Sequence, residues 1–223
     1  MKIKNLASTF AAYSVVICAI ALTANTGYRV YEQHHRPPTR PWKTGSQWRG
    51  LSATGNRVGS QHSITTIVVF SDYECPACLA LERQLRDIRE RYGSSVSIVY
   101  RDFPLPFHEH ARSAAIASQC AAEQGRFAAY HDRLFDDFGT LGQKSLIATA
   151  ATVHVSDTTM FDRCLHDPRT EAAVDVDVNT GKRLGVYATP TVIIGADAYL
   201  GVPVDLMQIV ERQIQSDQPN RKA

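Results

Sequence analysis

The feature that most restricts how this chain can fold is a C-P-A-C motif at residues 75–78, set between a buried strand and a helix. The preceding segment 64–70 (ITTIVVF) is apolar and β-branched, which is typical of a buried strand. Segment 79–92 then places apolar residues at helical spacing, and 96–100 (VSIVY) has the composition of a second strand. A strand, a helix and a strand in this order predict a βαβ unit with two parallel strands.

The position of this motif favours reactivity at its first cysteine. Cys75 stands at the predicted helix N-terminus, where unpaired N–H groups and the helix dipole stabilise a thiolate. Thiols in such positions have pKa values of roughly 3.5–7.5 instead of about 8.5. Cys78 lies one turn further along, placed to attack a mixed disulfide on Cys75 and release the bound partner. The motif therefore predicts a redox-active dithiol.

The rest of the chain predicts a block of helices, a hairpin and a last helix. Helical segments are expected at 111–124, 127–135, 145–153, 158–165 and 169–184. Segments 191–195 (TVIIG) and 198–202 (AYLGV) are close enough to form a hairpin, and 205–214 is amphipathic. We therefore expect an α/β domain over residues 63–223 with a helical insertion at about 105–184.

A C-x-x-C pair is also half of a zinc site, which needs two more ligands at comparable spacing. His108 and His110 are distant in sequence and only two residues apart, which makes a poor ligand pair, so we interpret them as polar residues at a helix start. No metal and no other cofactor is expected. The formal net charge of +2 over 223 residues gives no reason to expect nucleic-acid binding.

Residues 1–24 predict export from the cytoplasm. Lys2 and Lys4 precede a run from Leu6 to Ala24 that contains no charged residue. This run would extend about 28 Å as a helix, close to the ~30 Å of a bilayer core, which favours an uncleaved membrane anchor. The A-I-A sequence at residues 19–21 offers a small-x-small cleavage site, which favours a removed signal peptide. Both interpretations remain open.

Residues 25–62 predict a flexible basic linker. Residues 1–63 contain eight Lys/Arg and one acid (8 − 1 = +7), whereas 64–223 contain sixteen and twenty-one (16 − 21 = −5). The segment combines prolines and glycines with little apolar periodicity, so it cannot bury enough surface to offset its ordering entropy. The four cysteines outside the leader are even in number, which suits an exported protein in an oxidising compartment.

A Thr-Pro pair at residues 189–190 directly precedes the predicted strand 191–195, where a proline needs a positional reason. The strand, the C-P-x-C at a helix start, the helical insertion and this Thr-Pro before a hairpin together resemble the DsbA-like thioredoxin family. Segment 101–135 also resembles the insertion of the bacterial envelope members. The resemblance covers about residues 63–216 and implies a thioredoxin fold with an inserted α-helical domain, in a protein of the periplasm or cell envelope.

The same resemblance implies a role for each residue of the two motifs. Cys75 would be the exposed nucleophile and Cys78 the buried resolving cysteine. Pro190 would follow a cis peptide bond and would bring the Thr189 backbone beside the Cys75 sulfur. An extended substrate chain could pair with the backbone at that point.

Cys120 and Cys164 lie on two predicted helices of the insertion, where some relatives of this family carry a second disulfide. If paired, they would close a loop, and the chain-entropy model gives ~4 kcal/mol of stabilisation for this cross-link. The alternative is two separate buried thiols. We expect a structural disulfide.

The residues around the motif depart from the best-known oxidase of the family, which has a His directly before the second cysteine. Ala77 cannot supply that positive charge. Asp72 and Glu74 precede the motif, and nearby negative charge raises a thiol pKa. The sequence therefore predicts a weaker oxidant.

The expected function is that of an enzyme, a thiol–disulfide oxidoreductase that exchanges disulfides with protein thiols and oxidises exported proteins. The resemblance implies a membrane redox partner that recharges the dithiol. The alternatives are a reductase of envelope protein disulfides and a redox-inactive envelope chaperone or assembly factor. An isomerase is disfavoured because residues 25–62 are too poor in apolar residues for a dimerisation domain, so we expect a monomer.

Overall fold

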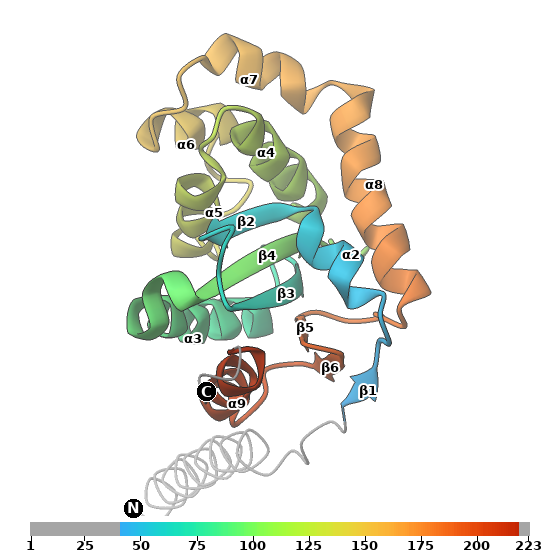
Figure 1. Cartoon of the computed structure of the whole chain (residues 1–223). Coiled ribbons are helices and arrows are strands. Elements are labelled where there is room, and N and C mark those ends of the chain that lie inside the picture. The colour runs from blue at the N-terminus through green and yellow to red at the C-terminus, as the bar shows by residue number, and fades with distance from the viewer. Residues whose placement is uncertain (1–40, 219–223) are drawn as a thin grey trace, which may run out of the picture. The chain divides into compact units, whose positions relative to one another are not determined.

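The computed structural model describes residues 41–218, and a six-stranded mixed sheet forms their centre (Figure 1). The strand order is β1-β6-β5-β3-β4-β2. β3 (Thr65–Ser71) and β4 (Val96–Asp102) are parallel, and every other neighbouring pair is antiparallel. Helix α3 (Pro76–Tyr92), followed by the short 3-10 turn Gly93–Ser95, makes the crossover between the parallel strands. The predicted βαβ unit is therefore confirmed.

The elements after β4 follow the predicted order, whereas β1, α2 and β2 were not predicted. The remaining strands are β1 (Trp42–Lys43), β2 (Asn56–Gly59), β5 (Thr191–Ile194) and β6 (Asp197–Leu200). The remaining helices are α2 (Trp48–Ala53), α4 (Ala111–Glu123), α5 (Phe127–Asp136), α6 (Leu146–Thr152), α7 (Thr158–Leu165), α8 (Pro168–Arg183) and α9 (Leu206–Asp217). Helices α4 to α8 lie between β4 and β5 in the chain, so they interrupt the sheet region as an insertion.

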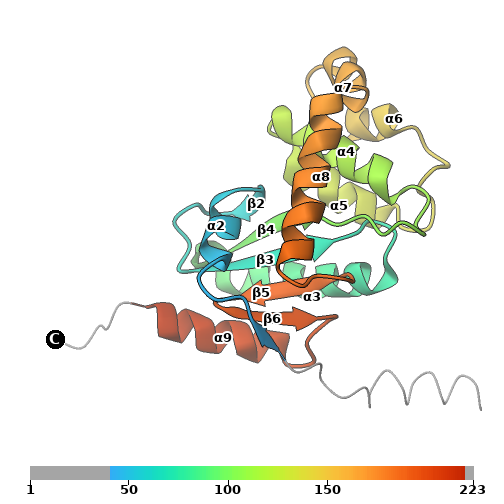
Figure 2. The same ribbon diagram turned by 90° about the vertical axis from the view of Figure 1, so that its right-hand side faces the viewer.

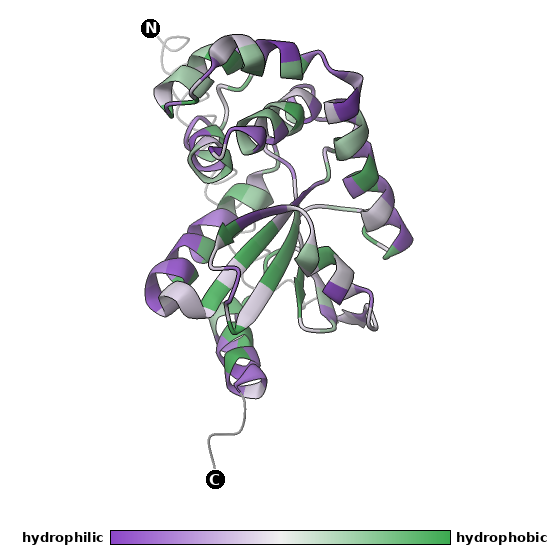
Figure 3. Ribbon diagram, turned by 45° about the horizontal axis from the view of Figure 1, so that its top comes forward, coloured by the Kyte–Doolittle hydropathy of each residue, from purple (hydrophilic) through white to green (hydrophobic). Residues whose placement is uncertain are grey.

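The sheet is covered on both faces, which explains why its central strands are apolar without alternation. In β3, Ile67 and Val69 pack in one core cluster with α3 and α9. Val68 and Phe70 point to the opposite face and pack with Leu51 of α2. Figure 3 shows the central strands as hydrophobic and much of the outer helix surface as hydrophilic.

The helical insertion has a core of its own, which includes Tyr130, Phe135 and Phe161. Cys75 and Cys78 belong to this same cluster, so the C-P-A-C motif lies where the insertion meets the sheet layer. Helix α8 leads from the insertion back to the sheet (Figure 2). It passes close to the sheet at Gly181, where an added Cβ would lie 2.9 Å from the Phe103 ring.

The linker prediction is wrong for residues 41–62, which form part of the sheet domain. β1 pairs with β6, and β2 pairs with β4, so this segment supplies both edge strands. Leu51 of α2 is buried. Strands of two and four residues are too short to show a periodic pattern, and their stability comes from pairing with distant strands. The predicted leader 1–24 and the linker residues 25–40 lie outside the described residues. No helix within 41–218 is long and apolar enough to cross a bilayer.

Candidate functional site

The C-P-A-C motif starts α3 as the sequence predicts. Cys75 occupies the N-cap position with an extended backbone, and its carbonyl accepts from the N–H of Cys78 at 3.0 Å and of Leu79 at 3.2 Å. Pro76 fills the first helical position, where a missing N–H has no consequence. The remaining free N–H groups of the first turn therefore face the Cys75 side of the helix end.

The two thiols of this pair differ strongly in pKa. The pKa of Cys75 is lowered to about 5, chiefly by the Cys78 thiol, with smaller contributions from Thr189 and from the N–H groups of Cys78 and Ala77. Burial opposes this shift. The pKa of Cys78 is raised well above its usual value, first by burial and then by the neighbouring Cys75. The pair therefore combines a ready thiolate with a thiol that retains its proton.

Cys75 is more enclosed than the sequence suggested, whereas Cys78 is buried as expected. Cys75 was expected to be exposed, yet it is only 6% exposed, against 1% for Cys78. Both are free thiols in this structure. Cys75 thus remains the more accessible of the two. Burial is the largest cause of the raised pKa of Cys78, and hydrogen bonding to Cys78 is the largest cause of the lowered pKa of Cys75.

The Thr-Pro segment lies directly against the motif. The Cys75 Sγ is 3.4 Å from the carbonyl oxygen of Thr189, and the Thr189–Pro190 peptide bond is cis. The hydroxyl of Thr191 donates to the Ala188 carbonyl at 2.9 Å. The Pro190 carbonyl accepts from the N–H of Gly201, which directly follows β6, at 2.8 Å. The structure therefore brings the Thr189–Pro190 pair next to Cys75 and Cys78, although the two motifs are more than a hundred residues apart in the sequence.

The acids before the motif do not act on Cys75 as expected. The buried Asp72 carboxylate accepts from the Leu105 N–H at 2.7 Å and from His108 Nδ1 at 2.8 Å. The Glu74 carboxylate accepts from the His110 N–H at 2.6 Å. Both acids thus connect the loop 103–110 to the motif by hydrogen bonds. The expectation that they raise the pKa of Cys75 is wrong, because that pKa is lowered, chiefly by the Cys78 thiol.

The contact between His108 and Asp72 was not anticipated from the sequence, and no local signal would have found it. The two residues belong to different segments that meet only because β3 and β4 pair in parallel, with Ser71 opposite Asp102. The interpretation of His108 as a mere helix-start residue is therefore incomplete.

One group of side chains within 41–218 has the composition of a metal site; it lies on α3 and α5, and its Glu82 is one helical turn after Cys78. Oxygen or nitrogen atoms of Glu82, His131 and Asp132 lie within 4.8 Å of one another. Glu82 already accepts from the Tyr100 hydroxyl at 2.7 Å and lies 3.3 Å from Arg89 Nη2. The Glu82 carboxylate therefore already has protein hydrogen-bond donors. We interpret Glu82, His131 and Asp132 as a polar network within the protein.

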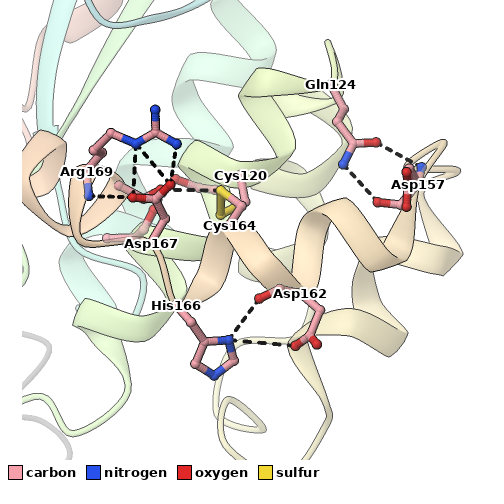
Figure 4. The surroundings of a disulfide bond; sticks show 11 residues. Cys120, Gln124, Asp157, Asp162, Cys164, His166, Asp167 and Arg169 are labelled. Carbon is pink, nitrogen blue, oxygen red and sulfur yellow. Dashed lines mark hydrogen bonds and ion pairs between the residues drawn. A yellow bond between two sulfur atoms is a disulfide. The ribbon is translucent and has the colours of Figure 1, made fainter.

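The second cysteine pair is joined in the structure. Cys120 of α4 and Cys164 of α7 form a disulfide with a Cα–Cα distance of 5.7 Å (Figure 4). Cys120 is completely buried, and Cys164 lies 3.4 Å from the Thr170 hydroxyl. The bond connects two helices of the insertion and does not involve the C-P-A-C motif.

Comparison with known proteins agrees with this geometry. A family model described as thioredoxin (Thioredoxin_4) matches residues 52–210. The catalytic domain of Proteus mirabilis ScsC is 25% identical, covering 76% of this chain and 96% of its own, with a TM-score of 0.64. The thiol-disulfide exchange protein alpha-DsbA2 from Wolbachia pipientis is 20% identical, covering 78% of this chain and 93% of its own, with a TM-score of 0.67.

Similarity also extends to part of a much longer protein. The Na(+)/H(+) antiporter NhaA 3 of Salinispora tropica is 32% identical over 144 residues, which are 64% of this chain and 22% of the antiporter. The chain therefore spans about a fifth of the length of this curated relative. The shared region is too small a part of the antiporter to carry over its activity.

The family match begins at residue 52, inside the segment that the sequence had suggested was a linker. Together with the sheet order and the solved structures, it confirms a thioredoxin fold with an inserted helical region. The resemblance noted from the motifs is confirmed at the level of family and fold: the chain belongs to the thioredoxin family, in the arrangement seen in DsbA-like proteins.

Proposed function

We propose that the protein is an extracytoplasmic thiol–disulfide oxidoreductase that oxidises the thiols of exported proteins. The observation that carries the proposal is the position of the Cys75 sulfur at the start of α3, one turn before Cys78 and 3.4 Å from the Thr189 carbonyl oxygen. This arrangement provides a nucleophile, a second sulfur and a backbone edge for a substrate chain within one small region.

The reaction starts from the disulfide between Cys75 and Cys78. A substrate thiolate attacks the Cys75 sulfur, the bond to Cys78 breaks, and Cys78 leaves and takes up a proton. A second substrate thiolate then attacks the substrate sulfur of the mixed disulfide, and Cys75 leaves as a thiolate. The substrate loses two electrons and gains a disulfide, while the protein ends as the dithiol.

The pKa of about 5 at Cys75 supports the oxidising direction. A thiolate that is stable in the folded protein stabilises the reduced state relative to the disulfide, which makes the disulfide a stronger oxidant. It also makes Cys75 a good leaving group in the second step. This argues against the weak oxidant that Ala77, Asp72 and Glu74 had suggested.

The Thr189 carbonyl offers a hydrogen-bond acceptor to an extended substrate backbone beside the reactive sulfur. Such pairing is independent of side-chain sequence and suits many protein substrates. After each turnover the dithiol must return two electrons to an oxidant, for which we propose a membrane redox partner. The charge-free run 6–24 suggests export to the compartment where such a partner works.

The decisive measurement is the reduction potential of the pair Cys75/Cys78 in the full chain, by equilibration in glutathione buffers. We expect a value of about −120 to −180 mV, typical of disulfide donors. A value near about −270 mV would show a reductase instead. A pair that fails to titrate would favour a redox-inactive envelope factor.

A further inference from the structure

We infer that His108 is a positioning residue for disulfide exchange at Cys78, acting through the buried carboxylate of Asp72. This inference rests on the proposed function, since it concerns the step in which the sulfur of Cys78 enters or leaves the disulfide. His108 acts on neither sulfur directly. Its effect passes through the turn of residues 71–74, which connects β3 to the motif.

The Asp72 side chain is the centre of this arrangement. It is fully buried and accepts from the Glu74 N–H at 2.8 Å, the Leu105 N–H at 2.7 Å and His108 Nδ1 at 2.8 Å. A carboxylate can only accept hydrogen bonds, so Nδ1 of His108 carries the hydrogen in this contact. Two of the donors are backbone groups, and His108 supplies the one donor that a substitution can remove.

The same turn also affects the second sulfur of the motif. The Asp72 N–H and the Ser71 hydroxyl lower the pKa of Cys78, although burial and the neighbouring Cys75 raise it by more. The Cys75 N–H in turn donates to the Asp72 carbonyl at 3.2 Å. The Asp72 carboxylate therefore fixes the position of this turn, and the Asp72 N–H and Ser71 hydroxyl of the same turn act on Cys78.

These contacts matter most when Cys78 bears charge. When a thiolate attacks the Cys75 sulfur, the bond to Cys78 breaks and the electron pair leaves with the Cys78 sulfur. This sulfur is buried, so the Asp72 N–H and the Ser71 hydroxyl are the donors that stabilise it in the transition state. Loss of the His108 contact leaves a buried carboxylate short of one donor, and the turn then shifts to recover it.

Cys75 depends on a different set of donors. Its thiolate is stabilised by the Cys78 thiol, by Thr189 and by N–H groups of the first turn of α3. None of these donors is a group of Asp72 or Ser71. Removal of the imidazole should therefore slow exchange at Cys78 and leave the reactivity of Cys75 nearly unchanged, which a general loss of structure would not do.

The test compares His108→Leu with His108→Asn, whose Nδ2 lies near the position of the imidazole Nδ1 and can donate to the same carboxylate. The control is His166→Leu, which removes an imidazole that is 79% exposed. Two rates are measured on the full chain: opening of the Cys75–Cys78 disulfide by reduced glutathione at pH 7, and alkylation of Cys75 by iodoacetamide in a Cys78→Ser background.

We expect His108→Leu to slow the opening by glutathione about tenfold and to leave the alkylation rate within about twofold. His108→Asn should restore most of the opening rate, and His166→Leu should change neither rate. An unchanged opening rate in His108→Leu, or an equal fall in both rates, would overturn the positioning role. A wild-type disulfide that glutathione does not open would instead overturn the proposed function itself.

Discussion

Cys75 and Cys78 are one helical turn apart, yet their pKa values move in opposite directions. Cys75 receives hydrogen bonds at the open end of α3, whereas Cys78 lies inside the first turn and is almost fully buried. A single charge shared between two nearby sulfurs settles on the one with more donors. The division of labour between nucleophile and resolving thiol therefore follows from their positions in the helix.

The pH dependence of Cys75 tests this division. In the reduced protein, alkylation of Cys75 should be half-maximal near pH 5, because the pKa is lowered to about 5. An unstructured cysteine has a pKa of about 8.5, so the low value stabilises the folded reduced state above pH 8.5, and this contribution is lost as the pH falls to 5. The oxidised protein has no such thiol.

The Tm advantage of the reduced over the oxidised protein should therefore shrink between pH 8.5 and pH 5. Both are measured by thermal unfolding at several pH values, with Cys75→Ser as the control in which this dependence is absent. Half-maximal alkylation near pH 8.5 would contradict the assigned donors of Cys75.

At the scale of elements, the disulfide between α4 and α7 holds together two helices whose contacts are otherwise made by small or few apolar residues. The buried side of α4 is rich in alanine, including Ala114, Ala117 and Ala121. α7 buries only Phe161 and Cys164. Alanine contributes little apolar area, so a covalent link adds stability where packing adds less.

Loss of this disulfide should lower stability without affecting exchange. The cysteines Cys120 and Cys164 are separated by 44 positions, for which the chain-entropy model gives about 4 kcal/mol. In a Cys75→Ala/Cys78→Ala background, a reductant cleaves only this bond, so the fall in unfolding free energy measures the disulfide without creating a cavity. A Cys120→Ala/Cys164→Ala variant should still open its Cys75–Cys78 disulfide at the wild-type rate. A large loss of that rate would show that the two cysteine pairs are coupled.

At the scale of the whole molecule, residues 41–62 close the sheet at both edges and tie it to the insertion. The Arg101 guanidinium donates to the Leu51 carbonyl at 3.1 Å and pairs with Asp177 of α8 at 2.6 Å. β4, α2 and α8 therefore meet at one buried arginine. The family match begins at residue 52, directly after Leu51.

A substitution at Leu51 tests whether this segment is part of the core. Leu51 is 4% exposed and packs with Val68 and Phe70, so Leu51→Ala should lower the unfolding free energy by about 2–3 kcal/mol. Ile64→Ala, at a position that is 39% exposed, should cost about 1 kcal/mol or less. Denaturant unfolding of both variants gives the comparison. Equal effects would mean that the segment adds nothing to the core.

The sequence by itself determined the features that depend on neighbours along the chain. The apolar run before Cys75, the helical spacing after Cys78 and the turn-separated strands near 191–202 are local patterns, and each element formed where its pattern lies. The Cys120–Cys164 pairing could be expected only through the family resemblance, because spacing alone allows other pairings.

The tertiary structure decided what depends on residues that meet only after folding. The strands at 42–43 and 56–59 exist because distant strands pair with them, and nothing in their own sequence indicates it. The pKa of Cys75 falls chiefly because the Cys78 thiol lies beside its sulfur, and the carboxylates of Asp72 and Glu74 accept from backbone N–H groups of the loop 103–110. A charge is visible in a sequence, but its effect depends on distance and on competing partners, which only the fold provides.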